Sequence, residues 1–140
     1  MITFNQYISL TLSRYAVNLS TIGCGENGDT YNINGDTAAA CIAGALQAQR
    51  LIMMTDTAGI LLDKDDPGTL IPAITPDEAE ELKKSGVISG GMIPKVDCCT
   101  EALSKGVENV VIMDGRIPHS ILMELLTDEG AGTMVTGKKK

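Results

Sequence analysis

The sequence of 140 residues has few of the residue types on which several classes of protein depend. It has no tryptophan and only 3% aromatic residues, so its core must be built from Ile, Leu, Val, Met and Ala. A net charge of -7 at pH 7 argues against nucleic acid as the main partner, because phosphate backbones require a basic surface. A small phosphate ligand needs only backbone N–H groups and one or two cations, so the negative net charge does not exclude it. No stretch approaches the ~18 apolar residues of a membrane helix, so we expect no membrane partner.

Histidine is equally scarce, and the cysteines lack the spacing of a metal or redox site. His119 is the only histidine, so the sequence has neither a zinc set nor a Ser/His/Asp or Cys/His group. Without a C-x-x-C pair, the cysteines are predicted to be buried free thiols in a reducing compartment, and the protein is not expected to be secreted. We predict no metal site from the side chains. The four cysteines are Cys24, Cys41, Cys98 and Cys99.

The sequence instead contains a series of short strand and helix signals. Residues 1–15 show no clear period and stay unassigned, and residues 138–140 are a basic tail. Between them we predict one domain, 16–137, in which strands and helices follow one another along the chain. This order predicts an α/β fold with a mainly parallel sheet. The expected strands are 16–22, 51–55, 108–115 and 132–137, and the expected helices are 36–50, 75–86, 94–106 and 118–130.

Two of these helices begin with residues that cap a first turn. Asp36 or Thr37 is placed to cap the alanine-rich helix. Thr75, Pro76 and Glu78 have the spacing of a capping box with proline at the first helical position. These signals are local, so they predict where each helix begins without reference to the rest of the chain.

Three polar segments follow strands, where ligands bind in a sheet of this type. In "YNINGD", Asn32 and Asn34 alternate with Ile33, so both amides can point to one side. Asp36 follows at the helix start, either as a simple cap or to orient a lysine or a metal-bound phosphate. In "TDTAG", Thr55 and Asp56 end a buried strand, and a turn in which Asp bonds its own backbone is the plainer interpretation.

The third segment, "SGGMIPKV", places two glycines before a helix that begins with proline and lysine. It is either a loop that needs glycine dihedrals beside a surface lysine, or a backbone that approaches an anion. In the second case Gly90 and Gly91 make room, and Lys95 supplies the positive charge. Taken alone, the motif favours the plain loop, and the sequence contains no Walker P-loop and no G-x-G-x-x-G motif, so none of the three segments is specific alone.

Taken in order, the segments resemble the C-terminal half of the acetylglutamate kinases, a branch of the amino acid kinase family. The resemblance runs from about residue 17 to about residue 136. It includes "YNINGDTAA", "TDTAGIL", "SGGMIPKV" and "DGRIPHSILMELLTDEGAGTM". It implies a three-layer αβα sandwich. The implied reaction transfers the γ-phosphoryl of ATP to the side-chain carboxylate of N-acetyl-L-glutamate, a step of arginine biosynthesis. Mg²⁺ would be held mainly by the phosphates of ATP.

The resemblance also implies roles for individual residues. Lys95 would stabilise charge on the transferring phosphoryl group, Asp36 would hold the lysines in place, and Asn32, with Asn34 beside it, would bind acetylglutamate. The implied nucleotide-binding residues are Thr55, Asp56, Thr57, Ala58, Gly59, Ile60, Leu61, Val87, Ile88, Ser89, Gly90 and Gly91.

Regulation enters by the same resemblance. Glu124 and Gly130 match the segment near which some members bind arginine, but Val111 stands where many arginine-sensitive members have histidine. The "DKDDPG" loop and the adjacent cysteines are more similar to the plastid and cyanobacterial branch, in which the signalling protein PII binds the kinase. The resemblance therefore implies the cytoplasm or the plastid stroma as the location, with a homo-oligomer and PII as expected partners.

The family's N-terminal half, with another catalytic lysine and more of the acetylglutamate pocket, is not found in these residues. We therefore expect a truncated kinase that is inactive alone, with an open sheet edge. The alternatives are a non-catalytic nucleotide-binding or regulatory module, another amino acid kinase such as aspartate or glutamate 5-kinase, and a fold remnant that binds no ligand.

Overall fold

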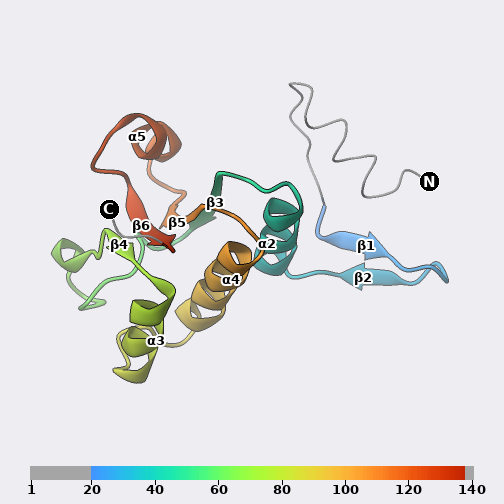
Figure 1. Cartoon of the computed structure of the whole chain (residues 1–140), viewed down its shortest axis with the longest axis horizontal. Coiled ribbons are helices and arrows are strands. Elements are labelled where there is room, and N and C mark those ends of the chain that lie inside the picture. The colour runs from blue at the N-terminus through green and yellow to red at the C-terminus, as the bar shows by residue number, and fades with distance from the viewer. Residues whose placement is uncertain (1–19, 138–140) are drawn as a thin grey trace.

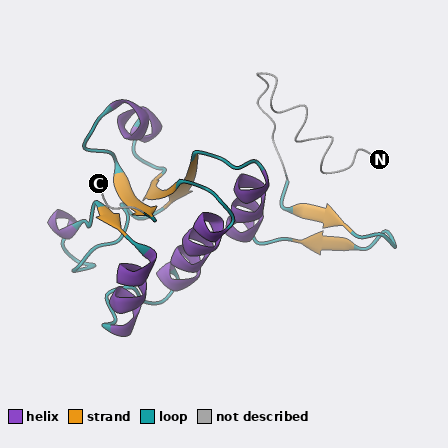
Figure 2. Ribbon diagram, in the orientation of Figure 1, coloured by secondary structure: helices purple, strands orange, loops and turns teal. Residues whose placement is uncertain are grey.

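The computed structural model describes residues 20–137. Most of the strand expected at 16–22 lies outside them, as do the unassigned segment and the basic tail. Four strands form the central sheet in the order β3-β5-β6-β4 (Figures 1 and 2). The pairs β3–β5 and β4–β6 are parallel, and β5–β6 is antiparallel, so the predicted mainly parallel sheet is confirmed. The bounds are β3 Arg50–Thr55, β4 Ala73–Ile74, β5 Asn109–Asp114 and β6 Gly132–Thr136.

Helices lie on both faces of this sheet. The helices α2 (Gly35–Ala45) and α4 (Met92–Ser104) pack side by side against one face, and α5 (Ser120–Leu126) lies on the other (Figure 1). Between the sheet and the first two helices lies the main core, whose fully buried members are small or branched, as the lack of aromatic residues requires. The layers are the αβα arrangement that the resemblance implied. Core residues include Ala40, Met53, Val96, Cys99, Ala102, Val110 and Ile112.

One predicted helix start is confirmed and the other is wrong. The helix α3 (Pro76–Lys84) begins with the expected capping box between Thr75 and Glu78. In α2, however, the cap is Asn34 and not Asp36 or Thr37: the Asn34 side chain accepts a hydrogen bond from the Thr37 backbone N–H at 3.1 Å. Asn34 directly precedes the first helical residue, Gly35, so its side chain can accept from the backbone N–H of Thr37, which has no partner inside the helix. The Asp36 carboxylate is then available for another partner.

Two features of the fold were not predicted. The strands β1 (Ile22–Cys24) and β2 (Thr30–Asn32) form an antiparallel hairpin that projects from α2, away from the sheet (Figure 2). The short strand β4 and a 3-10 turn (Pro67–Thr69) lie within the loop expected after β3. Both involve two or three residues per element, which is too short to give a period in the sequence.

The cysteine prediction is half right. All four thiols are free in the described residues, but only Cys98 and Cys99 are buried, whereas Cys24 and Cys41 are exposed. Cys24 lies in the projecting hairpin and Cys41 on the outer side of α2, so neither faces the core. None of the helices within residues 20–137 has the length and apolar content that crossing a bilayer requires.

Candidate functional site

The first turns of α2 and α4 meet beside each other, and a salt bridge joins them. Lys95 Nζ lies 3.0 Å from Asp36 Oδ2, although the two residues are 59 positions apart. Their side chains are 28% and 35% exposed, so the pair is neither sealed in the core nor fully solvated. Two helix N-termini therefore lie beside one lysine, and their dipoles and the ammonium together favour an anion. The N–H groups of Met92 and Ile93 already donate to the Ser89 and Gly90 carbonyls, so any N–H groups offered to a ligand come from the glycine pair before α4.

The glycine pair provides an open backbone at the start of α4. Gly90 has φ of +55°, a left-handed conformation that favours glycine, and Gly91 caps the helix without any side-chain hydrogen bond. A Cβ added at either residue would meet no atom within 4 Å, so this backbone faces free space. We call Asp36, Gly90, Gly91 and Lys95 the candidate site. Its lysine and its open backbone are the parts that the sequence predicted for an anion.

A buried thiol lies directly behind the salt bridge. Cys98, one turn after Lys95, has its Sγ 3.9 Å from the Thr37 hydroxyl oxygen. Burial, with a smaller contribution from nearby carboxylates, raises the pKa of the Cys98 thiol, and burial raises that of Cys99 to about 12. Both thiols are therefore protonated at neutral pH and serve as packing between α4 and its neighbours.

The two asparagines that were predicted to act together have different surroundings. Asn32 ends β2 and is exposed, with no side-chain hydrogen bond inside residues 20–137. Asn34 is held at the start of α2 by its bond to Thr37. Its amide oxygen is therefore engaged by the helix N-terminus, and Asn32 is the one whose side chain is available to a ligand.

The predicted nucleotide segment after β3 divides into an exposed and an anchored part. Asp56 and Thr57 are exposed. Gly59 and Ile60 are buried against β6, where the Ile60 N–H donates to the Thr133 hydroxyl at 2.8 Å. A Cβ on Gly59 would lie 2.6 Å from that hydroxyl oxygen, and its φ is +143°, so only glycine fits. The segment thus begins with two exposed polar residues and continues into a backbone that β6 holds in place. Of the remaining members, Thr55, Ala58 and Leu61 are half-buried.

The second predicted nucleotide segment lies between α3 and α4. Val87 is half-buried, Ile88 is 1% exposed, and Ser89 is exposed. The Ile88 N–H donates to the Leu82 carbonyl, which ties this segment to α3. Ile88 therefore anchors the chain in the core just before the glycines, and this fixes where Gly90 and Gly91 can lie.

One polar group near the site was missed from the sequence. Arg116, two residues after the end of β5, binds the Asp114 carboxylate at 2.8 and 3.0 Å and donates to the Asp56 backbone carbonyl. Its guanidinium holds the pKa of Asp114 at about 2, below the ordinary value of 3.8. A basic residue two positions after an aspartate at a strand end was the available signal. Arg116 links the ends of the parallel strands β3 and β5.

The residues expected at an effector site also meet, in a buried contact. Glu124, 6% exposed, accepts hydrogen bonds from Arg50 at 3.3 Å and from the Ala131 N–H at 3.0 Å. Gly130 has φ of +71° beside this carboxylate. The two hydrogen bonds hold α5 to the start of β3 and to the turn before β6. In this arrangement Arg50 is the charged partner of the Glu124 carboxylate.

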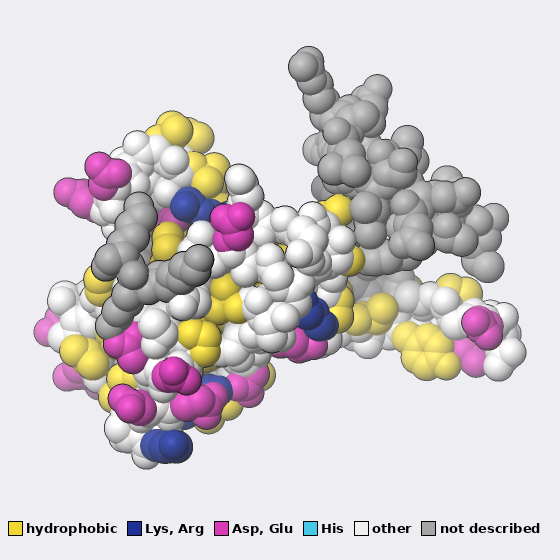
Figure 3. Space-filling view, viewed as in Figure 1, with side chains coloured by type: hydrophobic (Ala, Val, Ile, Leu, Met, Phe, Trp, Pro, Cys, Tyr) yellow, Lys and Arg dark blue, Asp and Glu magenta, His cyan; other side chains and the backbone are white. Residues whose placement is uncertain are grey.

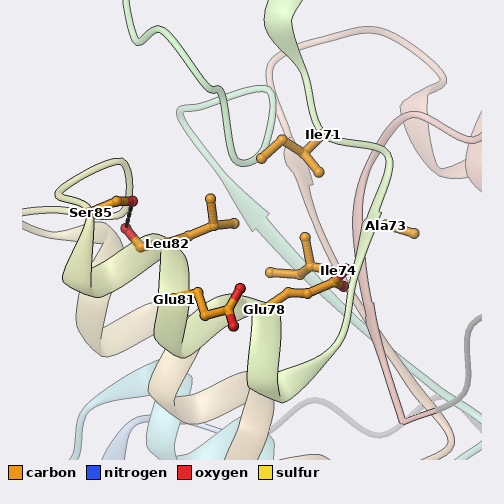
Figure 4. A pocket seen from close by; sticks show the side chains of 7 residues that line it. All are labelled: Ile71, Ala73, Ile74, Glu78, Glu81, Leu82 and Ser85. Carbon is orange, nitrogen blue, oxygen red and sulfur yellow. Dashed lines mark hydrogen bonds between the residues drawn. The ribbon is translucent and has the colours of Figure 1, made fainter.

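A pocket of about 450 Å³ lies apart from these residues, between β4 and α3 (Figure 4). Its floor is apolar and two glutamates stand at its rim. Glu78 belongs to the capping box, and Glu81 adds a second acidic group, so the rim repels phosphate. None of the predicted site residues lines it. The lining residues are Ile71, Ala73, Ile74, Glu78, Glu81, Leu82 and Ser85.

Comparison with curated proteins identifies close relatives. The chain is 52% identical over 131 residues to the acetylglutamate kinase of Nostoc sp., which covers 94% of this chain and 44% of the relative. It is 55% identical over 117 residues to the acetylglutamate kinase of Heliobacterium modesticaldum, covering 84% and 40%. The chain thus spans less than half the length of the curated relatives it matches.

Solved structures give the same fold. N-acetylglutamate synthase from Neisseria gonorrhoeae, complexed with coenzyme A and L-arginine, superposes with a TM-score of 0.76 at 30% identity, over 86% of this chain and 27% of that one. Carbamate kinase from Giardia lamblia bound to AMP-PNP superposes with a TM-score of 0.58 at 22% identity, over 80% and 36%. Residues 9–114 match the amino acid kinase family, a range that begins within the segment left unassigned above. The chain belongs to the amino acid kinase family.

Proposed function

We propose that this chain is the nucleotide-binding half of an acetylglutamate kinase, which transfers the γ-phosphoryl of ATP to the side-chain carboxylate of N-acetyl-L-glutamate in arginine biosynthesis. The relatives at 52% and 55% identity carry that name. Because the chain covers 44% and 40% of them, turnover by the chain alone is not part of the proposal. The observation that carries it is the Lys95–Asp36 salt bridge at the start of two helices.

Phosphoryl transfer needs positive charge around the transferring group more than it needs covalent chemistry. Lys95 supplies that charge from the first turn of α4. Asp36, 3.0 Å away, is a positioning residue that keeps the ammonium at the helix N-termini when no phosphate is bound. A lysine held by one carboxylate costs less side-chain entropy to place than a free one, so the site is ordered before the nucleotide arrives.

The nucleotide in this proposal has its phosphates at Gly90 and Gly91 and its remainder toward the two predicted segments, 55–61 and 87–89. The open glycine backbone suits phosphate oxygens, since N–H groups can approach them without a side chain between. Mg²⁺, carried mainly by the nucleotide phosphates, would add positive charge at the equatorial oxygens. Asn32 is the proposed contact of acetylglutamate, because its amide is exposed and lies just before α2.

A second candidate is a nucleotide-binding or regulatory module without catalysis. The observation that favours it is the length of the match, under half of each relative. Nucleotide binding without phosphoryl transfer, even in the presence of the unmatched part of a relative, would support this candidate. Regulation by arginine near Glu124 and Gly130, binding of PII, and a place in the cytoplasm or plastid stroma remain proposals by family resemblance.

Isothermal titration of the purified chain with MgADP and MgATP tests the binding half of the proposal. We expect a dissociation constant between micromolar and sub-millimolar, weakened roughly 10- to 100-fold in Lys95→Ala, since a charge-assisted hydrogen bond contributes about 1.5–3 kcal/mol. Lys84→Ala, which removes an exposed lysine at the end of α3, is the matched control and should bind as the wild type does. A folded wild-type sample that gives no heat of binding would refute the proposal.

A further inference from the structure

Arg116 is held in place by hydrogen bonds but keeps one nitrogen of its guanidinium free. Its Nε and Nη2 donate to the two oxygens of the Asp114 carboxylate at 3.0 and 2.8 Å, and Nη2 also donates to the Asp56 backbone carbonyl. The Arg116 backbone N–H adds a hydrogen bond to Asp114 at 2.8 Å. A guanidinium carries five N–H donors, and the two on Nη1 have no partner within residues 20–137. The side chain is 69% exposed, so a ligand can reach it.

Arg116 lies at the same edge of the sheet as the candidate site. The strands β3 and β5 are parallel, with Thr55 opposite Asp114, so both end at this edge. The helix α4 packs against β5, and only the short turn 105–108 separates the two, so the helix and the strand run in opposite directions. The first turn of α4, with the glycine pair and Lys95, therefore lies at the carboxyl ends of the strands, where ligands bind in such sheets.

Arg116 is also held on the face of the sheet that α2 and α4 cover. Successive side chains of a strand alternate between the two faces. Ile112 belongs to the main core beneath these helices, and it is paired with Met53, whose sulfur contacts Cys99 on α4. Asp114, two residues after Ile112, therefore points to this face and holds the Arg116 guanidinium there. The guanidinium and the candidate site thus share one edge and one face of the sheet.

The charges around Arg116 do not suit a phosphate. Asp114 is ionised at neutral pH, because Arg116 holds its pKa at about 2, and this carboxylate offsets the charge of the guanidinium. The Asp56 carboxylate also interacts with Arg116, so the three groups together carry a net negative charge. Basic side chains are likewise scattered among acidic ones over the face that Figure 3 shows. Because an arginine has donors only, the free Nη1 suits neutral acceptors such as sugar hydroxyl oxygens or ring nitrogens of a base.

We propose that Arg116 binds the adenosine end of the nucleotide, through hydrogen bonds from Nη1 to its sugar and base, while Lys95 binds the phosphates. This inference rests on the proposed function and adds a residue that neither predicted nucleotide segment includes. The Nη2 bond to the Asp56 carbonyl also fixes the start of the segment 56–61 beside the same part of the ligand. Because Asp114 already holds the side chain in one position, binding costs it little further side-chain entropy.

Isothermal titration of the full chain with adenosine, MgADP and magnesium tripolyphosphate, which has phosphates but no nucleoside, tests this division. Arg116→Ala should weaken the binding of adenosine and MgADP roughly tenfold, the effect of one or two hydrogen bonds, and change that of tripolyphosphate by less than about twofold. Lys95→Ala should weaken MgADP and tripolyphosphate and leave adenosine unchanged. Lys84→Ala, at an exposed position of α3, is the control and should bind all three as the wild type does.

Arg116→Lys separates the shape of the guanidinium from its charge. A lysine keeps the positive charge but cannot bind Asp114 through two nitrogens and offer a third to a ligand. We therefore expect adenosine to bind as weakly to Arg116→Lys as to Arg116→Ala. The position is exposed, so neither change disturbs the core, and circular dichroism checks the fold of each variant. Full recovery of adenosine binding in Arg116→Lys would overturn the proposal, because charge alone would then be sufficient.

The remaining outcomes distinguish this inference from the proposed function. A wild-type chain that binds none of the three probes would refute both. A wild type that binds MgADP, with an Arg116→Ala variant that binds adenosine equally well, would overturn the inference alone. The same holds if Arg116→Ala weakens tripolyphosphate as much as adenosine, since Arg116 would then act on the phosphates. If adenosine binds too weakly to measure, the ratio of MgADP to tripolyphosphate affinity decides, and it should fall roughly tenfold in Arg116→Ala.

Discussion

The hydroxyl of Thr133 is the group on which the predicted nucleotide segment depends for its position. It is fully buried, accepts a hydrogen bond from the Ile60 N–H at 2.8 Å, and donates one to the Ile71 carbonyl at 2.7 Å. Thr133→Val keeps the shape of the side chain and removes both bonds. The change therefore tests whether one side chain of β6 holds two loop segments in place.

The size of the effect follows from the two groups that lose their partner. Each hydrogen bond contributes roughly 1 kcal/mol net, and a buried N–H or C=O left unpaired adds a desolvation cost of about 1–3 kcal/mol. Valine regains a little by its added methyl group. We expect the free energy of unfolding to fall by about 2–4 kcal/mol. For a domain of this size that corresponds to a melting temperature lowered by roughly 6–12 °C.

Urea unfolding followed by circular dichroism measures the stability, and hydrogen exchange at the Ile60 amide measures the loop. The matched control is Thr30→Val, at an exposed position of β2, which should change the stability by less than about 0.5 kcal/mol. If the two variants are equally stable, the Thr133 hydroxyl does not hold the loop and the reasoning is refuted. In the proposed function, Thr133→Val should also weaken nucleotide binding, because the segment beginning at Asp56 loses its anchor.

Three further predictions follow from other contacts. Arg116→Ala should return the pKa of Asp114 from about 2 toward 3.8. Because the folded-state pKa is the lower one, the pair stabilises the fold above about pH 4 and loses this effect as the pH falls to 2, so the stability difference between variant and wild type should shrink over that range. Gly132→Ala directs a Cβ into a backbone carbonyl of β5 and should cost more than about 3 kcal/mol, whereas Gly137→Ala meets open space and should be neutral. Cys99, with a pKa of about 12, should react with a thiol reagent at pH 8 only on unfolding, and immediate reaction would contradict its burial; the exposed thiols that should react at once are Cys24 and Cys41.

Several elements were predictable because their signals are local. The capping box of Thr75 and Glu78 lies within four residues, and it fixed the start of α3 correctly. The apolar runs of 51–55 and 108–115 predicted strands, and both form, but only β5 is buried as expected, whereas β3 is buried at Met53 alone. Glycines with positive φ, Gly86 and Gly106, follow the last residues of α3 and α4. In each case the hydrogen bonds or dihedral limits that decide the structure connect neighbouring residues.

Other features depended on contacts that no local pattern contains. The cap of α2 was predicted at Asp36 or Thr37, but Asn34 takes that role and the Asp36 carboxylate pairs with Lys95. The helix α5 has an apolar sequence that would normally be read as a buried helix, yet its buried side chains are Ser120 and Glu124. Glu124 can be buried because Arg50, 74 residues away in the chain, is its charged partner there.

The sequence by itself determined the class of fold, the starts of the four helices to within two residues, and the residue types of an anion site, because propensity, capping and hydrophobic period act over a few residues. It placed the ends of α2 and α5 four or five residues too late. Only the tertiary structure decided that Lys95 and Asp36 form one salt bridge, that Thr133 holds the loop after β3, and that β3 and β4 are the outer strands of the sheet within residues 20–137. Those outcomes are set by how α2, α4 and the strands pack, and packing joins residues whose separation along the chain carries no period.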